Sequence, residues 1–238
     1  MKTCFWKAIG AGVGIVLASS VWVRGGTIYD NTTTDKGTSL SLLNGYTIGD
    51  EIIMGNAFQA NVVTNFSFEI YSSQATFTGG ANVKMEVFLY QNNGATTNGF
   101  AKPGTVQYDS GAFTLSTPQQ FGGSNVFVAT LTFDLSSTPV LVPHDFTLGV
   151  KVTGLSGADT VGMEMFEPAT VGNNYGEYWM NNGSWDLYTN SVVADFGARF
   201  QGTGSVPEPS TLCLGAVGAA FLMGFTWLRR RRDQLKQD

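Results

Sequence analysis

Side chains that bind metals or act as nucleophiles are scarce in this sequence. The 238 residues include only 2 cysteines and 1 histidine, and Cys4 and Cys213 lie toward opposite ends. The region between the terminal segments therefore offers neither a disulfide nor a thiol nucleophile. Zinc needs three or four nitrogen or sulfur ligands, which His144 alone cannot supply. A Ser-His-Asp hydrolase would also have to use His144, and no Gly-x-Ser-x-Gly segment is present.

Basic residues are scarce in the centre of the chain. Residues 27–205 hold fifteen acidic and five basic residues, a net charge of about −10. Proteins that bind a phosphate backbone need basic patches, so we expect no nucleic-acid partner. No P-loop or dinucleotide-binding glycine pattern occurs in a strand-to-helix context.

Calcium is the one metal for which oxygen ligands are available. Ca²⁺ takes oxygen ligands from clustered carboxylates and amides. The residues that could converge in space are Asp30, Asn31, Asp35, Asp50 and Glu51. The glycine-rich loop around Gly157 offers only Asp159, and neither place has an Asp-x-Asp-x-Asp spacing. A structural calcium ion stays open as an alternative, and no other cofactor is expected.

Paired carboxylates could cleave glycosidic bonds, because that reaction uses two acidic residues. With fifteen acidic residues in the central region, however, some pair is expected by chance. Most of these residues alternate outward on the expected strands or fall in loops. We therefore predict that the protein is not an enzyme.

The N-terminal segment has the pattern of a signal peptide. Lys2 and Lys7 precede an uncharged apolar run at residues 8–19. A basic segment followed by such a run is typical of secretory signals. Small residues at 18–20 allow cleavage after Ser20, and residues 23–25 offer a second position. We assign residues 1–25 to a signal helix that directs export; a buried core helix is the alternative.

The C-terminal segment has the pattern of a membrane anchor. Residues 211–228 are eighteen residues without a charge. A helix of that length spans about 27 Å, close to the thickness of the hydrocarbon core. Pro207 and Pro209 keep the preceding stretch extended. We predict a transmembrane helix at 211–228 that anchors the protein in a membrane. A cytoplasmic stop follows it, formed by Arg229, Arg230, Arg231 and Arg232.

Three elements in a row, Val-Pro-Glu-Pro-Ser at 206–210, an apolar helix and a basic cluster, resemble the PEP-CTERM sorting domain. The resemblance implies that residues 204–238 are a sorting signal read by an exosortase, a processing membrane protease. Pro207, Glu208 and Pro209 would be its recognition residues. Cleavage near them would move the protein from the inner membrane to the cell surface or the extracellular space. A plain tail anchor with an incidental Pro-Glu-Pro is the alternative.

The central region, residues 26–203, shows strand patterns separated by turn signals such as Asn92-Asn93-Gly94 and Pro103-Gly104. Alternation at 60–70, 83–90, 125–135 and 145–152 gives four strands. The expected inward residues are Val62, Phe66, Phe68, Ile70, Val83, Met85, Val87, Leu89, Phe127, Ala129, Leu131, Phe133, Phe146, Leu148, Val150 and Val152. We predict an all-β ectodomain, a two-sheet antiparallel sandwich that is jelly-roll-like. A parallel α/β fold is excluded because its crossover helices are missing.

Short segments of this region resemble the choice-of-anchor surface domains. They are residues 27–31, 48–52, 103–105 and 108–111. The resemblance implies a β-rich ectodomain that occurs with various C-terminal anchors. It supplies no catalytic residues.

Aromatic residues are densest at residues 173–188, which we interpret as a hairpin with its turn at 181–184. Trp179, Trp185 and Tyr188 could stack on sugar rings, with neighbouring amides binding hydroxyls. Alternatively, they form cross-strand pairs that stabilise the hairpin. The leading hypothesis is a non-catalytic structural or interaction protein of the cell surface. A carbohydrate-binding module for exopolysaccharide is the alternative, and a glycan-acting enzyme is the weakest.

Overall fold

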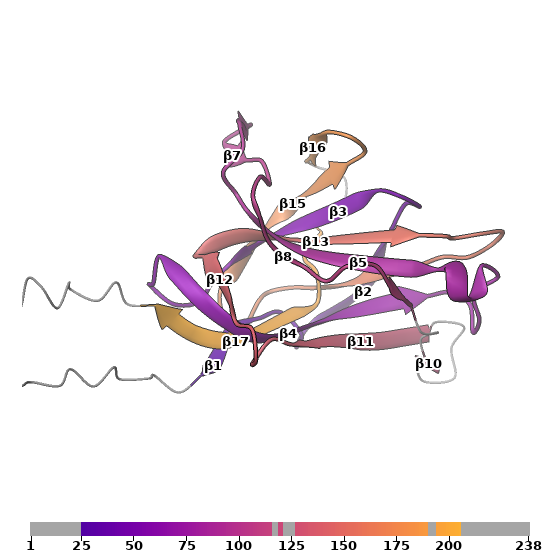
Figure 1. Ribbon diagram of the computed structural model, residues 1–238, viewed down its shortest axis with the longest axis horizontal. Coiled ribbons are helices and arrows are strands. Elements are labelled where there is room, and N and C mark those ends of the chain that lie inside the picture. Colours follow the sequence, from indigo (N-terminus) through magenta and orange to yellow (C-terminus); the bar gives the residue numbers. More distant parts are fainter. Residues whose placement is uncertain (1–24, 116–118, 121–126, 190–193, 206–238) are drawn as a thin grey trace, which may run out of the picture. The chain divides into compact units, whose positions relative to one another are not determined.

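A computed structural model describes residues 25–115, 119–120, 127–189 and 194–205. These residues form two antiparallel sheets that pack face to face, so the all-β sandwich is confirmed (Figure 1). Almost all of the predicted signal helix and all of the predicted membrane helix lie outside the described residues. Within the described ranges, no helix has the length and apolar character needed to cross a membrane.

The first sheet is built around one long central strand. Its strands are β1 (Gly26–Asp30), β2 (Asp35–Ser41), β4 (Ala60–Ser72), β10 (Gln119–Gln120), β11 (Phe127–Asp134), β12 (Val140–Pro143), β14 (Gly162–Phe166) and β17 (Ala198–Ser205). The order is β1-β17-β4-β11-β10, with β12 also paired to β4, and β14 paired to both β4 and β2.

The second sheet has the order β16-β15-β3-β13-β5-β8, with β9 also paired to β5. Its strands are β3 (Thr47–Ile53), β5 (Lys84–Gln91), β8 (Val106–Asp109), β9 (Phe113–Thr114), β13 (Asp145–Thr153), β15 (Asn173–Asn181) and β16 (Trp185–Tyr188). A small hairpin of β6 (Thr96–Thr97) and β7 (Phe100–Ala101) stands apart from both sheets, and a 3₁₀ turn, η1 (Gly80–Asn82), precedes β5.

Strand alternation places the core as predicted along β5 and β13. The side chains between the sheets are fully buried at Val83, Met85, Val87, Leu89, Phe146, Leu148, Val150 and Val152. Ala129, Leu131 and Phe133 of β11 pack against this core as half-buried residues. Period-two alternation is thus sufficient to assign these strands, since successive side chains point to opposite faces.

The predicted inward face of β4 is wrong at one residue. Phe66, Phe68 and Ile70 are buried, but Val63 is buried in place of Val62. The register between β4 and β17 shifts between Gln201 and Gly202, which is where a bulge inserts an extra residue. A bulge changes which alternate residues face the core. Strict alternation therefore fails across it.

The first and last strands of the domain are neighbours. β1 pairs with β17, with Gly26 opposite Gly202. The compact unit that contains both strands spans Val23–Val206. The last strand ends at Ser205, so only Val206 separates it from Pro207 of the predicted sorting signal.

Candidate binding pocket and sorting motif

The aromatic hairpin formed by β15 and β16 is the edge of the second sheet, where β15 pairs with β3. Its turn has Gly183 at a φ of 94°, a left-handed conformation that glycine favours. Trp179 of β15 lies beside Gly49 in the neighbouring strand. Gly49 in turn pairs with Gly149. A Cβ at Gly149 would come within 2.7 Å of the Tyr90 ring, so this ring lies directly on bare backbone.

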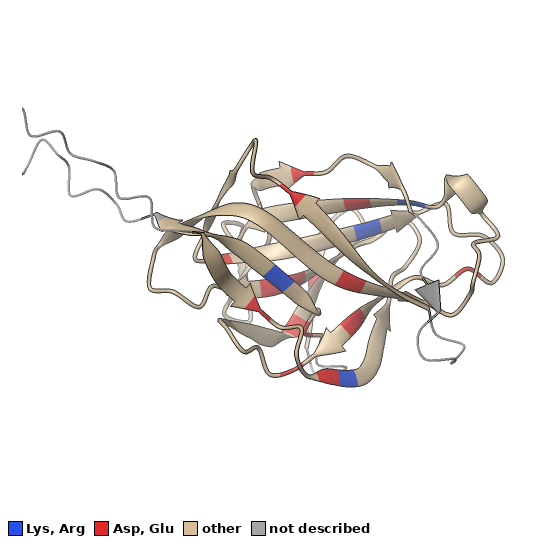
Figure 2. Cartoon of the chain, turned by 90° about the horizontal axis from the view of Figure 1, so that it is seen from below, with Lys and Arg blue, Asp and Glu red and all other residues tan. Residues whose placement is uncertain are grey.

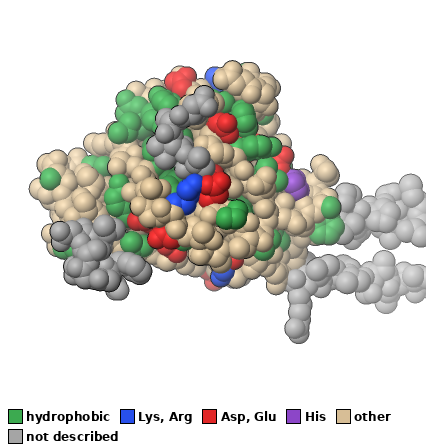
Figure 3. Space-filling model, turned by 180° about the vertical axis from the view of Figure 1, so that it is seen from behind, with side chains coloured by type: hydrophobic (Ala, Val, Ile, Leu, Met, Phe, Trp, Pro, Cys, Tyr) green, Lys and Arg blue, Asp and Glu red, His purple; other side chains and the backbone are tan. Residues whose placement is uncertain are grey.

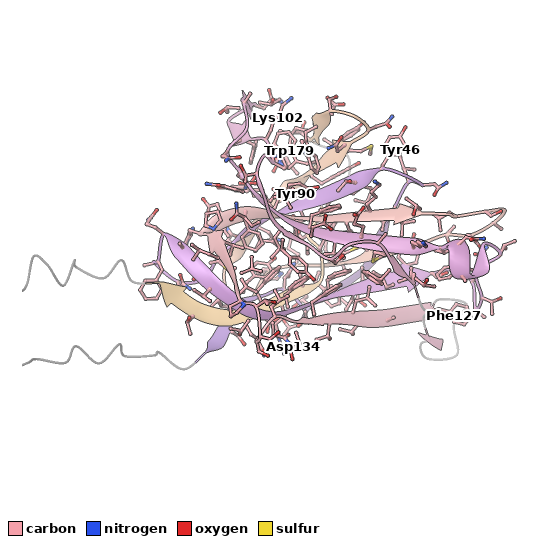
Figure 4. The ribbon with its side chains drawn as sticks, viewed as in Figure 1. Tyr46, Tyr90, Lys102, Phe127, Asp134 and Trp179 are labelled. Atoms are coloured by element: carbon pink, nitrogen blue, oxygen red, sulfur yellow. The ribbon has the colours of Figure 1, made fainter. Side chains whose placement is uncertain are left out.

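The side chain of Trp179 is only 1% exposed to solvent. The edge of the Trp185 ring meets Tyr90 at 5.2 Å between ring centroids. Lys102 reaches over from the loop after β7 and donates to the carbonyl oxygen of Trp185 at 3.0 Å. Figure 4 shows Trp179, Tyr90 and Lys102 on this side of the domain. The prediction that Trp179 contacts a glycan is therefore wrong, because the burial of its ring removes it from any ligand.

The other two predicted glycan contacts are more accessible. Trp185 is half-buried. Tyr188 is 39% exposed. The Tyr188 ring stacks on Tyr178 at 5.2 Å with the planes 11° apart. This is the cross-strand aromatic pairing expected of a stabilised hairpin. Glycan contact by Trp185 and Tyr188 stays a prediction.

A pocket of about 570 Å³ opens elsewhere in the domain. Its walls come from the end of β3, the start of β13, the β6–β7 hairpin and β15. The lining residues are Glu51, Gln59, Asn92, Asn98, Gly99, Phe100, Ala101, Pro143, His144, Asp145 and Tyr175. Rings, amides and carboxyl groups thus share one concave surface, the arrangement expected of a small-ligand site.

Glu51 is the most buried charged residue of the pocket. Its Oε1 accepts a hydrogen bond from Asn92 Nδ2 at 3.1 Å. Asn92 is fixed in turn, because its Oδ1 accepts from Thr147 Oγ1 at 2.7 Å. Burial raises the pKa of Glu51 to about 7, the negative charges of Asp145 and Glu177 add to the rise, and the Asn92 bond opposes it. Figure 2 shows that acidic residues are spread over strands of both sheets.

His144 and Asp145 line the pocket at the start of β13, the strand that pairs with the strand of Glu51. His144 Nδ1 lies 2.6 Å from Asp145 Oδ1. His144 Nε2 lies 2.8 Å from the carbonyl oxygen of Asn56. Both ring nitrogens therefore already have protein partners. His144 lies at the pocket wall and bonds to Asp145.

Two aromatic rings form the rim. Phe100 of the small hairpin meets Tyr175 of β15 edge-to-face, with ring centroids 5.0 Å apart. Tyr175 remains 38% exposed. Burial, followed by the nearby carboxylates of Glu51, Asp145 and Glu177, raises its pKa above the usual value. An exposed ring beside amides and carboxylates can stack on an apolar ligand face and bind hydroxyl groups.

Sequence reasoning did not find this pocket because no local pattern marks it. The lining residues come from segments near positions 51, 59, 92, 98–101, 143–145 and 175. Asn92 was interpreted only as part of a turn. The partial signal was Glu51, an acidic residue in a strand that is buried almost throughout.

The tail that follows the domain matches a known family. Residues 205–232 match the family model described as the PEP-CTERM protein-sorting motif. The chain carries this motif. It contains the predicted recognition residues Pro207, Glu208 and Pro209 and the four arginines. The chain matches no curated protein and no solved structure.

The motif implies export, a membrane-associated C-terminus and processing by an exosortase. It confirms the resemblance of the tail to the PEP-CTERM signal. The match covers the tail alone, so the resemblance of residues 26–203 to choice-of-anchor domains stays a prediction. The individual roles of the Pro-Glu-Pro residues and of the arginines also stay predictions.

The raised pKa of Glu51 predicts a measurable dependence of stability on pH. Its pKa rises from an ordinary 4.5 to about 7 in the folded protein. The folded state therefore binds the proton more tightly, and stability is lost as pH rises through that interval. Glu51→Gln should raise the free energy of unfolding by about 2 kcal/mol at about pH 8 and leave it unchanged at about pH 4. Urea unfolding at both pH values measures this, and an equal change at both would contradict it.

Proposed function

We propose that the chain is a non-catalytic surface protein that binds a polysaccharide outside the cell. The sorting motif supports the location, and the pocket that contains Tyr175 supports the binding. Before processing, the C-terminal segment holds the protein at the inner membrane. After processing, the domain is at the cell surface or in the extracellular matrix, where exopolysaccharide is the ligand we propose. We therefore assign glycan binding to the pocket, whereas the sequence alone suggested the aromatic hairpin.

The chemistry of the pocket favours a sugar over other small ligands. Tyr175 and Phe100 offer ring surface for the C–H face of a pyranose. Gln59, Asn92 and Asn98 are amides that both donate to and accept from hydroxyl groups. Figure 3 shows apolar, acidic and basic side chains interspersed on one face of the domain.

The negative charge of the pocket limits which sugars can bind there. Glu51, Asp145 and Glu177 place negative charge in and beside the pocket. Like charges at this distance are unfavourable, so uronic acids and phosphorylated sugars are disfavoured. Neutral sugars and amine-bearing sugars are favoured. This distinguishes the pocket from an anion-binding site.

A binding role is favoured over catalysis by how the carboxyl groups are held. The carboxyl group of Asp145 is hydrogen-bonded to the ring of His144. Glu51 is buried and bonded to Asn92. A glycosidase uses two carboxyl groups that flank the scissile bond. Here Glu51 and Asp145 both bond to protein partners, and we assign them to supporting the pocket.

Tyr175→Ala should weaken glycan binding by about tenfold, which corresponds to about 1.4 kcal/mol. Binding of the full chain in detergent to an array of neutral, amine-bearing and acidic oligosaccharides measures this. Tyr188→Ala is the matched control, because Tyr188 is as exposed as Tyr175, at 39% against 38%, but does not line the pocket. The control should bind like the wild type.

Three results would contradict the proposal. Absence of binding to any glycan would remove the carbohydrate function. Loss of binding in Tyr188→Ala with normal binding in Tyr175→Ala would show that the glycan binds at the aromatic hairpin and not in the pocket. Release of reducing sugar by the wild type, lost in Glu51→Gln, would show an enzyme.

A further inference from the structure

Four polar side chains lie inside the sandwich, away from the pocket. They are Tyr29, Asn31, Asp50 and Asp195, and none is more than 2% exposed. Asp50 lies on the inward face of β3 between Ile48 and Ile52, which are both buried. An unpaired carboxylate in such a position is costly, because burial disfavours the charged form. The cluster therefore requires a compensating partner.

Two of these side chains, those of Asn31 and Asp50, bond to the backbone of Phe196, and Asp195 is the residue directly before it. The Phe196 amide donates to Asp50 Oδ2 at 2.8 Å. Asn31 Nδ2 donates to the Phe196 carbonyl oxygen at 3.3 Å and to the Phe166 carbonyl oxygen at 2.8 Å. Asp195 is the residue before Phe196, and its own carbonyl oxygen accepts from the Phe166 amide at 2.9 Å. The groups of Asn31, Asp50 and Asp195 are thereby held in one place.

The atoms left over at this place are all oxygens. Tyr29 Oη, Asn31 Oδ1, Asp50 Oδ1 and Asp195 Oδ1 are buried and have no hydrogen-bond partner among the described residues. The nitrogen of Asn31 is already used, so its side chain offers only an acceptor. With both carboxyl groups ionised, only the Tyr29 hydroxyl carries a hydrogen among the four atoms, whereas a protonated carboxyl group would add one. In the ionised state, hydrogen bonding within the cluster leaves at least two acceptors without a partner, and a cation satisfies all of them.

We propose that Asn31, Asp50 and Asp195, with the Tyr29 hydroxyl, bind a buried Ca²⁺ ion. Ca²⁺ takes six to eight oxygen ligands, among which carboxylates, amide oxygens and water are usual. Its charge balances the two carboxylates. The described residues contain no group of three or more His, Cys, Asp or Glu side chains suited to a metal. Here the two carboxylates are completed by an amide and a phenol.

The basic residues nearby do not replace this cation. Lys36 acts on Asp195 but forms an ion pair with Glu167. Arg199 forms an ion pair with Asp30. Burial raises the pKa of Asp50 well above its usual value, and the charge of Asp195 adds to the rise. Burial also raises the pKa of Asp195, to about 7. Protonation of Asp50 and Asp195 therefore competes with the binding of Ca²⁺.

The structure selects among the five residues that the sequence left open for calcium. Asn31 and Asp50 belong to the cluster. Asp30 binds Arg199 and Thr32 instead. Asp35 accepts from the amide of Gly37 at the surface. Glu51 faces the pocket on the other side of β3. Asp195 was missed, because it lies far from the others in sequence and no motif surrounds it.

The test is thermal unfolding of the full chain in detergent at about pH 8, with chelator or with millimolar CaCl₂. CaCl₂ should raise the unfolding midpoint by about 5 °C or more. Asp50→Asn and Asp195→Asn remove one charge each with little change in shape, and both should lose this shift. Glu51→Gln is the matched control, because it neutralises the adjacent residue on the opposite face, and it should keep the shift.

Native mass spectrometry of the wild type gives an answer that does not depend on whether the variants fold. One Ca²⁺ per chain, absent in Asp195→Asn, is the expected result. No bound calcium and no shift in the wild type would overturn the proposal in favour of a proton shared within the cluster. If the calcium-dependent rise of the unfolding midpoint persists in both Asp→Asn variants but is lost in Glu51→Gln, the ion binds in the pocket and not in the cluster. Glycan binding is a separate readout, so either proposal can fail alone.

Discussion

Replacing both Pro207 and Pro209 by alanine should leave the C-terminal tail attached to the exported protein. The PEP-CTERM match at residues 205–232 implies processing by an exosortase. A protease reads its substrate as an extended chain, and proline disfavours helix both in its own position and in the residue before it. With alanine at both positions the helix predicted at residues 211–228 could extend into the recognition segment. The tail should then be resistant to cleavage.

Intact-mass measurement of the protein recovered from the cell surface and from the membrane fraction checks this result. The wild type should have lost the segment from Thr211 onward, whereas the double variant should keep it and remain in the membrane. Ser210→Ala is the control, because it changes the next residue without changing a proline. A wild-type surface protein with its complete tail would refute processing. Normal cleavage of the double variant would refute recognition through the prolines.

The position of the motif makes this experiment informative about the domain as well. β17 is held to β4 as far as Ser205, which pairs with Ala60. Only Val206 then precedes the first recognition proline. There is no long linker between the last sheet pairing and the motif. A block in cleavage therefore cannot be attributed to a missing spacer, and it reports on the motif itself.

Sequence reasoning succeeded where a strand is regular and covered by the opposite sheet. The alternation of Val83, Met85, Val87 and Leu89 was sufficient, because every inward position was buried. It failed at Val62, because a bulge between β4 and β17 is a property of two strands and not of one.

The functional surfaces were harder to predict, because distant segments create them. Trp179 faces outward on its strand, yet Lys102 and Trp185 lie over that face and the ring is buried. The pocket and the buried oxygen cluster likewise assemble residues that no spacing rule connects. In contrast, the sorting motif is contiguous, so a linear pattern was enough to recognise it.

Phe66→Ala should destabilise the domain by about 3–5 kcal/mol, the usual cost of removing a large buried aromatic side chain. The Phe66 ring is fully buried. It stacks on Phe133 at 4.6 Å and on Phe200 at 5.4 Å, and it meets Tyr108 edge-to-face at 5.7 Å. The first two rings come from neighbouring strands of the same sheet. Tyr108 comes from β8 of the other sheet, so this ring connects the two layers.

Equilibrium unfolding in urea measures this loss, and Leu141→Ala is the control. Leu141 belongs to β12, which pairs with the same strand as Phe66, but its side chain is 55% exposed. Its truncation should change the free energy of unfolding by no more than about 0.5 kcal/mol. A loss below about 1 kcal/mol in Phe66→Ala would mean that the sheets do not pack through this aromatic cluster. Phe200 lies on β17, which ends at Ser205, so such a result would also mean that this cluster does not hold the strand that precedes the sorting motif.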